Sequence, residues 1–165
     1  MITSDALLAE LAAAGIAART LRHPPVFTVA ESQALRGELP GAHSKNLFLR
    51  AAKGEGHFLA VLLESRQLSV NALARAAGWP RVSMASADDL RAILGVEPGS
   101  VTPFGLVNAA PGAVDVVLDA ALARAEGDVW FHPLVNTAST GIAPSDLLRF
   151  LAGRGHAVRV LELEG

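Results

Sequence analysis

Cysteine and tyrosine are both absent from this chain of 165 residues, and aromatic residues make up only 5% of it. Without cysteine, the protein forms no disulfide, uses no thiolate nucleophile and holds no metal through sulfur. The sequence also lacks an apolar run of membrane-spanning length, and its first residues lack the pattern of a secretory signal. We therefore expect a cytoplasmic protein that does not bind a membrane.

The chain also has no large excess of either charge. It contains 14 Lys and Arg residues and 16 Asp and Glu residues, for a net charge of −2. This balance argues against a protein that coats nucleic acid regardless of sequence and against DNA as a partner. It still allows a local basic patch that contacts one RNA end. Hydrophobic residues make up 51% of the chain and no repeat or linker divides it, so we expect a single domain over residues 1–165.

The sequence contains none of the common cofactor motifs. There is no Walker loop, no dinucleotide fingerprint and no Gly-x-Ser-x-Gly elbow, and the five histidines have no metal-ligand spacing. We therefore assign neither a metal nor a cofactor.

Capping residues and turn residues divide the chain into short helices and strands. The predicted helices cover residues 4–14, 28–37, 70–77, 87–94 and 145–152. The predicted strands cover residues 16–22, 44–50, 57–63, 81–85, 106–108, 114–118, 129–131 and 158–163. Because helices and strands alternate irregularly and include hairpins, we expect a mixed α/β sheet rather than a doubly wound parallel one.

The strand predicted at residues 44–50 carries a lysine on an apolar face. Because side chains alternate along a strand, Lys45 shares one side with Leu47 and Leu49, whereas Asn46 points to the other. An ammonium group in this position either extends to water at the strand end or lines a pocket for an anionic or strongly polar ligand. The segment by itself leaves both interpretations open.

Three further segments can carry chemistry or can be ordinary structure. The loop at residues 99–103 lies among glycines and prolines, so its backbone groups either face a ligand or form a plain turn. His132 follows an aromatic strand end and precedes a proline, which fixes its ring in either a site or a core. The polar run at residues 136–141 either lines a pocket or leads into the following helix.

Four motifs occur in order along nearly the whole chain. They are His23-Pro24 with Phe27-Thr28-Val29-Ala30-Glu31, the run from Pro40 to Leu49, the run from Leu94 to Phe104, and Phe131-His132-Pro133-Leu134 with Asn136-Thr137. Their joint order and spacing resemble the YbaK/prolyl-tRNA-synthetase-associated editing-domain family, and within it the free-standing branch that hydrolyses alanyl-tRNA(Pro). One departure is Ala109, since relatives often carry Asp after the asparagine found here as Asn108.

The resemblance implies a barrel-like mixed sheet flanked by helices, with the site in a cleft on the sheet. It implies a catalytic group made of Lys45, Gly99, Ser100 and Pro103. Lys45 matches the family's essential lysine, and Gly99 and Pro103 match the ends of its Gly-x-x-x-Pro motif. The resemblance assigns contacts with the aminoacyl end of the substrate to Val29, Asn46, Thr102, His132, Asn136 and Thr137. Among these, Val29 and His132 would shape the aminoacyl pocket, and Asn46 matches the branch's Lys-Asn pair.

The implied reaction is hydrolysis of the ester that joins alanine to the terminal ribose of tRNA(Pro). A synthetase pocket made for proline disfavours a smaller side chain by only about 1–3 kcal/mol per missing methylene-sized group. Translation therefore needs a second site that hydrolyses the mischarged product. We expect the backbone of residues 99–103 to hold the substrate, a ribose hydroxyl to help activate water, and Lys45 to supply positive charge without a covalent intermediate.

The expected partner is the 3′ end of aminoacylated tRNA(Pro), with prolyl-tRNA synthetase or an elongation factor as a transient partner. Five basic residues are either contacts for the acceptor stem or ordinary surface charges, namely Arg22, Arg50, Lys53, Arg66 and Arg75. Two alternatives remain open from the sequence. One is the same fold acting on cysteinyl-tRNA(Pro), and the other is a tRNA-binding module without catalytic activity.

Overall fold

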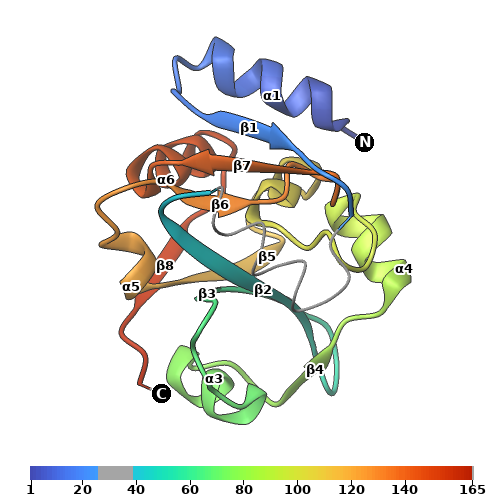
Figure 1. The fold of residues 1–165 in the computed structure, drawn as a ribbon. Helices are drawn as coiled ribbons and strands as arrows, with labels where there is room; N and C mark the ends of the chain where they lie inside the picture. The colour runs from blue at the N-terminus through green and yellow to red at the C-terminus, as the bar shows by residue number, and fades with distance from the viewer. Residues whose placement is uncertain (26–38, 165) are drawn as a thin grey trace.

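The computed structural model describes residues 1–25 and 39–164, and a mixed sheet forms its centre (Figure 1). Within these residues seven strands follow the order β1-β7-β6-β2-β3-β5-β8, and an eighth, β4, pairs with β2. The strands are β1 (Arg19–Arg22), β2 (Ala42–Ala51), β3 (His57–Leu63), β4 (Val82–Met84), β5 (Val114–Asp119), β6 (Val129–Phe131), β7 (Ala138–Ile142) and β8 (Val158–Leu161). The pair β2–β3 is antiparallel and the pair β3–β5 is parallel, which confirms the mixed α/β prediction.

Short helices flank the sheet. They are α1 (Ser4–Ala13), α3 (Val70–Ala77), α4 (Ala87–Asp89), η1 (Leu90–Leu94), η2 (Pro103–Asn108), α5 (Ala120–Ala123) and α6 (Pro144–Gly153). Serines cap α3 and α4, because the hydroxyls of Ser69 and Ser86 accept hydrogen bonds from the third residue that follows each. No helix among the described residues is long and apolar enough to cross a membrane.

Strand β2 connects two parts of the sheet and separates two cores. Its first residues, Ala42 and His43, pair in parallel with β6, and from Ser44 onward it pairs antiparallel with β3. Leu49 belongs to the core beneath α3, whereas Phe48 belongs to the larger core that contains η2 and α6. The alternation predicted for this strand is therefore correct, and both of its faces are covered.

The strand predicted at residues 106–108 is wrong, because these residues form the end of the 3-10 helix η2. Pro103 lacks an N–H and suits the first helical position, while the Thr102 hydroxyl accepts a hydrogen bond from the Phe104 N–H at 3.2 Å. Leu106 and Val107 are buried. Apolar composition over so few residues does not distinguish a buried strand from a buried helix.

The polar run at residues 136–141 contains a strand that the sequence did not indicate. Residues of β7 pair antiparallel with both β1 and β6, so small polar side chains such as Ser139 and Thr140 are buried. Sheet pairing of the backbone outweighs the weak strand preference of this segment. The short helix α5 was also not predicted, and the helix predicted at residues 28–37 lies outside the described residues.

Candidate functional site

The Lys45 ammonium donates a hydrogen bond to the backbone carbonyl of Arg66, in the turn that follows β3. Lys45 is half-buried, and its neighbour across the ladder is Leu62, which belongs to the core beneath α3. A carbonyl therefore replaces part of the water that the charge would otherwise require. An ammonium has three N–H donors, and the other two have no partner among the described residues.

His132 lies on the same face of the sheet as Lys45. In the parallel pair of β2 with β6, His43 is opposite Trp130, so these two side chains point the same way. Lys45 follows His43 by two residues within β2, and His132 follows Trp130 by two residues, directly after the end of β6. The structure thus places on one face an ammonium from β2 and an imidazole from the residue after β6.

Ser139 reaches this face from the neighbouring strand. Gly141 pairs with Trp130, and a Cβ built at Gly141 would lie 2.9 Å from the Trp130 ring, so this position of β7 points to the Trp130 side. Ser139 is two residues away along β7 and therefore points the same way. The hydroxyl of Ser139 lies 2.8 Å from His23 Nε2.

Hydrogen bonds fix the two imidazoles that meet here. His132 donates from Nδ1 to the carbonyl of Ala138 at 3.1 Å, which leaves Nε2 as an acceptor in the neutral ring. His23 donates from Nδ1 to its neighbour Pro24, so in its neutral form Nε2 accepts from the Ser139 hydroxyl. The ring centroids of the two histidines are 6.4 Å apart.

The pKa of His132 is lowered from its ordinary value of 6.5. Burial is the main cause, and the nearby His23 adds to it, while the hydrogen bond to the Ala138 carbonyl acts in the opposite direction. His132 is therefore neutral at pH 7 and presents an acceptor nitrogen to the site.

The loop at residues 99–103 leads into η2, whose Phe104 contacts Phe131, the last residue of β6. Gly99 has φ +92 and is exposed, whereas Ser100 and Thr102 are buried. Phe104, directly after the loop, packs edge-on against Phe131 with ring centroids 5.9 Å apart. The structure thus brings the loop to the residue before His132, on the side of β6 that faces the larger core.

Asn46 points to the face opposite Lys45. Its amide nitrogen donates weakly to the Ser44 hydroxyl at 3.4 Å, and that hydroxyl donates to the carbonyl of Trp130 at 3.1 Å. Asn46 Oδ1 is buried without a hydrogen-bond partner among the described residues. An unpaired buried acceptor costs about 1–3 kcal/mol. The structure therefore does not bring Asn46 together with Lys45 and His132, because this oxygen is buried on the other face of the strand.

The remaining predicted residues differ in placement. Asn136 is half-buried and Thr137 is exposed just before β7, and the Thr137 carbonyl accepts a hydrogen bond from the His23 N–H at 2.9 Å. Val29 lies outside the described residues. Leu134 was not predicted, although it adopts φ +71 while buried in the larger core. A leucine held at positive φ two residues after His132 marks strain of the kind that gathers at functional sites.

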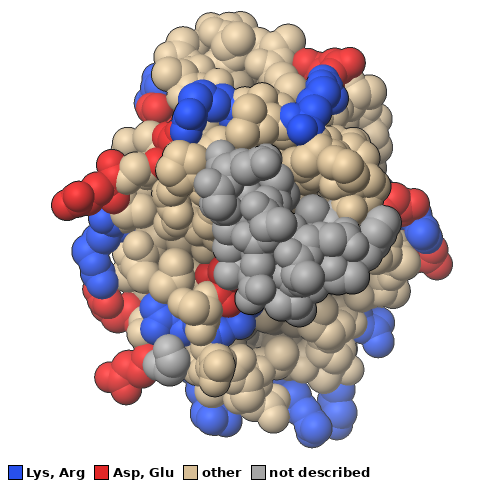
Figure 2. Space-filling view, in the orientation of Figure 1, with Lys and Arg blue, Asp and Glu red and all other residues tan. Residues whose placement is uncertain are grey.

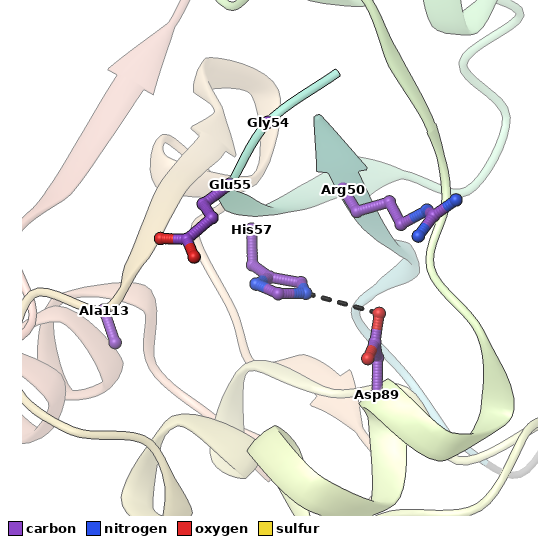
Figure 3. A pocket seen from close by; sticks show the side chains of 7 residues that line it. Arg50, Gly54, Glu55, His57, Asp89 and Ala113 are labelled. Carbon is purple, nitrogen blue, oxygen red and sulfur yellow. Dashed lines mark hydrogen bonds and ion pairs between the residues drawn. The ribbon is translucent and has the colours of Figure 1, made fainter. Parts of the chain in front are cut away.

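Two pockets lie at opposite ends of the β2–β3 pair. One, of about 340 Å³, opens between the start of β2 and the turn that follows β3, and is lined by Gly41, Ala42, His43, Leu63, Glu64 and Ser65. The other, of about 570 Å³, lies at the β2–β3 hairpin, where His57 Nε2 is 3.3 Å from Asp89 Oδ2 (Figure 3). Neither pocket is lined by a predicted site residue that the structure describes. Within the described ranges, no cluster of histidine and acidic residues could hold a metal.

Comparison with known proteins adds a family match. A model described as an aminoacyl-tRNA editing domain matches residues 23–150. A Bos taurus protein named prolyl-tRNA synthetase associated domain-containing protein 1 is 38% identical, over 96% of this chain and 94% of its own. The prolyl-tRNA editing protein ProX of Acetoanaerobium sticklandii is 32% identical, over 99% of both chains.

A solved structure supports the same fold. It is described as a "putative trans-editing enzyme for prolyl tRNA synthetase" and superposes with a TM-score of 0.70 over 99% of both chains at 23% identity. The eight-stranded mixed sheet with flanking helices is therefore the fold of that solved structure as well.

Proposed function

The chain belongs to the aminoacyl-tRNA editing domain family, and from that premise we propose that it hydrolyses the ester of mischarged alanyl-tRNA(Pro). The observation that carries the proposal is the shared face of Lys45 and a neutral His132, within the segment that the family model matches. Editing proteins of the prolyl system among the relatives support tRNA(Pro) as the carrier.

Lys45 supplies positive charge to the site. Its ammonium already donates to the Arg66 carbonyl and has two donors left for an ester carbonyl oxygen or a phosphate. Charge that develops on the ester oxygen in the transition state is stabilised by such a preplaced donor. In the neutral ring, His132 Nε2 accepts a hydrogen bond from the ammonium group of the alanyl moiety, and with Val29 it limits the size of the aminoacyl pocket.

Water attacks the ester directly in this mechanism. Ser139 and His23 form a hydroxyl–imidazole pair, but Nδ1 of His23 contacts the Pro24 carbonyl rather than a carboxylate. A serine triad needs an acid at that nitrogen to orient and charge-balance the imidazole. We therefore assign no nucleophile to the protein, and a hydroxyl of the terminal ribose assists the water.

An unpaired basic surface at one end of the molecule supports RNA as the substrate carrier. Four exposed cations, Arg50, Lys53, Arg75 and Arg81, have no ionic partner among the described residues. The Arg81 carbonyl accepts a hydrogen bond from the Ala52 N–H at 2.8 Å, which joins the hairpin to the strand that follows α3. The lower rim of Figure 2, below α3 and β4, shows basic side chains without acidic ones beside them. Phosphates of an acceptor stem fit this surface.

A deacylation panel tests the proposal. Purified protein is incubated with alanyl-, cysteinyl- and seryl-tRNA(Pro), and release of each amino acid is followed. We expect alanyl-tRNA(Pro) to be hydrolysed fastest, and Lys45→Ala to lose nearly all of that activity. Arg124→Ala, which removes a cation from an exposed ion pair with Glu162, is the matched control and keeps it. A preference for cysteinyl-tRNA(Pro), or RNA binding without hydrolysis, would overturn the proposed substrate or the proposed activity, respectively.

A further inference from the structure

A fully buried carboxylate lies behind the turn that holds Lys45. Asp119 is 0% exposed at the end of β5, and both of its oxygens are bonded to Arg66, through Nε and Nη2 at 2.9 Å each. The same carboxylate accepts hydrogen bonds from the N–H groups of Leu63 and Ala121 at 3.0 Å each. Asp119 thus joins the end of β3, the turn after it and the start of α5.

Arg66 is fixed at a third point, because Nη1 donates to the carbonyl of Leu163 at 2.8 Å. A bidentate guanidinium–carboxylate pair restrains both distance and plane, so the backbone of Arg66 has little freedom to move. Arg66 was among the candidates for RNA contact from the sequence. Its guanidinium instead lies in this internal network, with only 13% of its side chain exposed.

The backbone carbonyl of that same Arg66 receives the Lys45 ammonium. A lysine side chain is a long flexible stem, and its charge is useful to a reaction only where it is held in place. We infer that Asp119 is a positioning residue, which acts through Arg66 to hold the Lys45 ammonium where the substrate binds. The inference rests on the proposed function only for the role of Lys45, since the contacts themselves are independent of the reaction.

The Asp119 carboxylate can position Arg66 but cannot contact a substrate. Its four hydrogen bonds use both oxygens, and it has no exposed surface on which a substrate could bind. Removing its charge leaves the Arg66 guanidinium without its buried partner, so the turn moves and the carbonyl moves with it. The Lys45 ammonium then loses its fixed acceptor.

The test compares Asp119→Asn with Asp115→Asn. Asp115 lies on the same strand, and its ion pair with Arg159 is exposed at 3.3 Å, so the control makes the same chemical change outside the network. Lys45 and Lys53 are the two lysines of the chain, which makes lysine side-chain ¹⁵N spectra simple to assign. We expect slow solvent exchange for the Lys45 ammonium in the wild type and in Asp115→Asn, and its loss in Asp119→Asn.

Kinetics give the second readout. We expect Asp119→Asn to lower kcat for alanyl-tRNA(Pro) at least tenfold with KM changed less than twofold, because RNA docking does not involve the network. If Asp119→Asn alone does not fold, the double variant Arg66→Gln with Asp119→Asn is measured in its place, because it leaves no unpaired buried charge.

The outcomes separate the two proposals. Rapid exchange of the Lys45 ammonium in the wild type, an unchanged Lys45 signal in the folded variant, or an unchanged kcat would overturn the positioning role. Absence of deacylation in the wild type would refute the proposed function, while a Lys45 signal lost only in Asp119→Asn would still support the positioning of the ammonium.

Discussion

His23 and His132, which are 109 positions apart in the chain, lie with their rings 6.4 Å apart and tilted by 55°. Each ring donates from Nδ1 to a backbone carbonyl, and His23 also contacts the buried Ser139 hydroxyl. A charge on His23 disfavours a charge on His132, because two adjacent imidazolium ions repel each other. The protonation state of the pair therefore bears on both stability and activity.

Protonation of His132 should destabilise the fold. Its pKa is lowered in the folded protein, so between that pKa and 6.5 the unfolded chain binds more protons than the folded one. The free energy of unfolding therefore decreases as pH falls below 6.5, and becomes independent of this group below the folded pKa. Urea unfolding from pH 7.5 to 5 measures this slope, and His132→Asn should reduce it. If the stability of His132→Asn depended on pH as steeply as that of the wild type, the prediction would be contradicted.

Replacement of His23 should raise the pKa of His132 towards its ordinary value. His23→Gln removes the neighbouring titratable charge that contributes to the lowered value, while an amide can still bond the Ser139 hydroxyl. Histidine ring-proton NMR titrations of the wild type and the variant measure the shift directly. His156 is buried elsewhere and His156→Gln serves as the comparison that leaves the His132 titration unchanged. A His132 titration that is the same in His23→Gln would exclude this coupling.

Loss of basic side chains at the hairpin end should weaken RNA docking without slowing chemistry. Arg75→Ala and Lys53→Ala each remove one exposed cation that has no ionic partner among the described residues. We expect KM for alanyl-tRNA(Pro) to rise severalfold at nearly constant kcat, with the slope of log affinity against log salt reduced by about 1 per residue. Arg124→Ala is again the control, because this cation is paired with Glu162. A fall in kcat alone would argue against docking at this surface.

Gly105→Ala should destabilise the helix that supports the candidate loop. A Cβ at this position would lie 2.9 Å from the Cβ of Leu94, so η1 and η2 must separate. Overpacking of this kind costs about 1–3 kcal/mol of unfolding free energy. Gly127→Ala is the matched control, since a Cβ there meets no atom within 4 Å. Equal urea midpoints for the two variants would show that the close approach carries no cost.

Many elements of the fold could be predicted because their causes are local. Ser69 and Ser86 cap helices through hydroxyls that reach the third residue ahead, and Gly78 ends α3 with φ 72. The helix at residues 103–108 and the strand at 138–142 could not, since their apolar or polar composition fits several backbone states. Packing against Leu94 and pairing with β1 and β6 decided those two segments.

The sequence by itself determined that Lys45 alternates with leucines on one face of a strand, and that its motifs resemble an editing domain. Only the tertiary structure decided what surrounds that lysine. Parallel pairing of β2 with β6 put His132 on its face, and the Arg66 turn, held by Asp119, supplied its carbonyl. Alternation is a property of neighbouring residues, whereas these contacts join residues that are distant in the chain and meet only when the sheet is assembled.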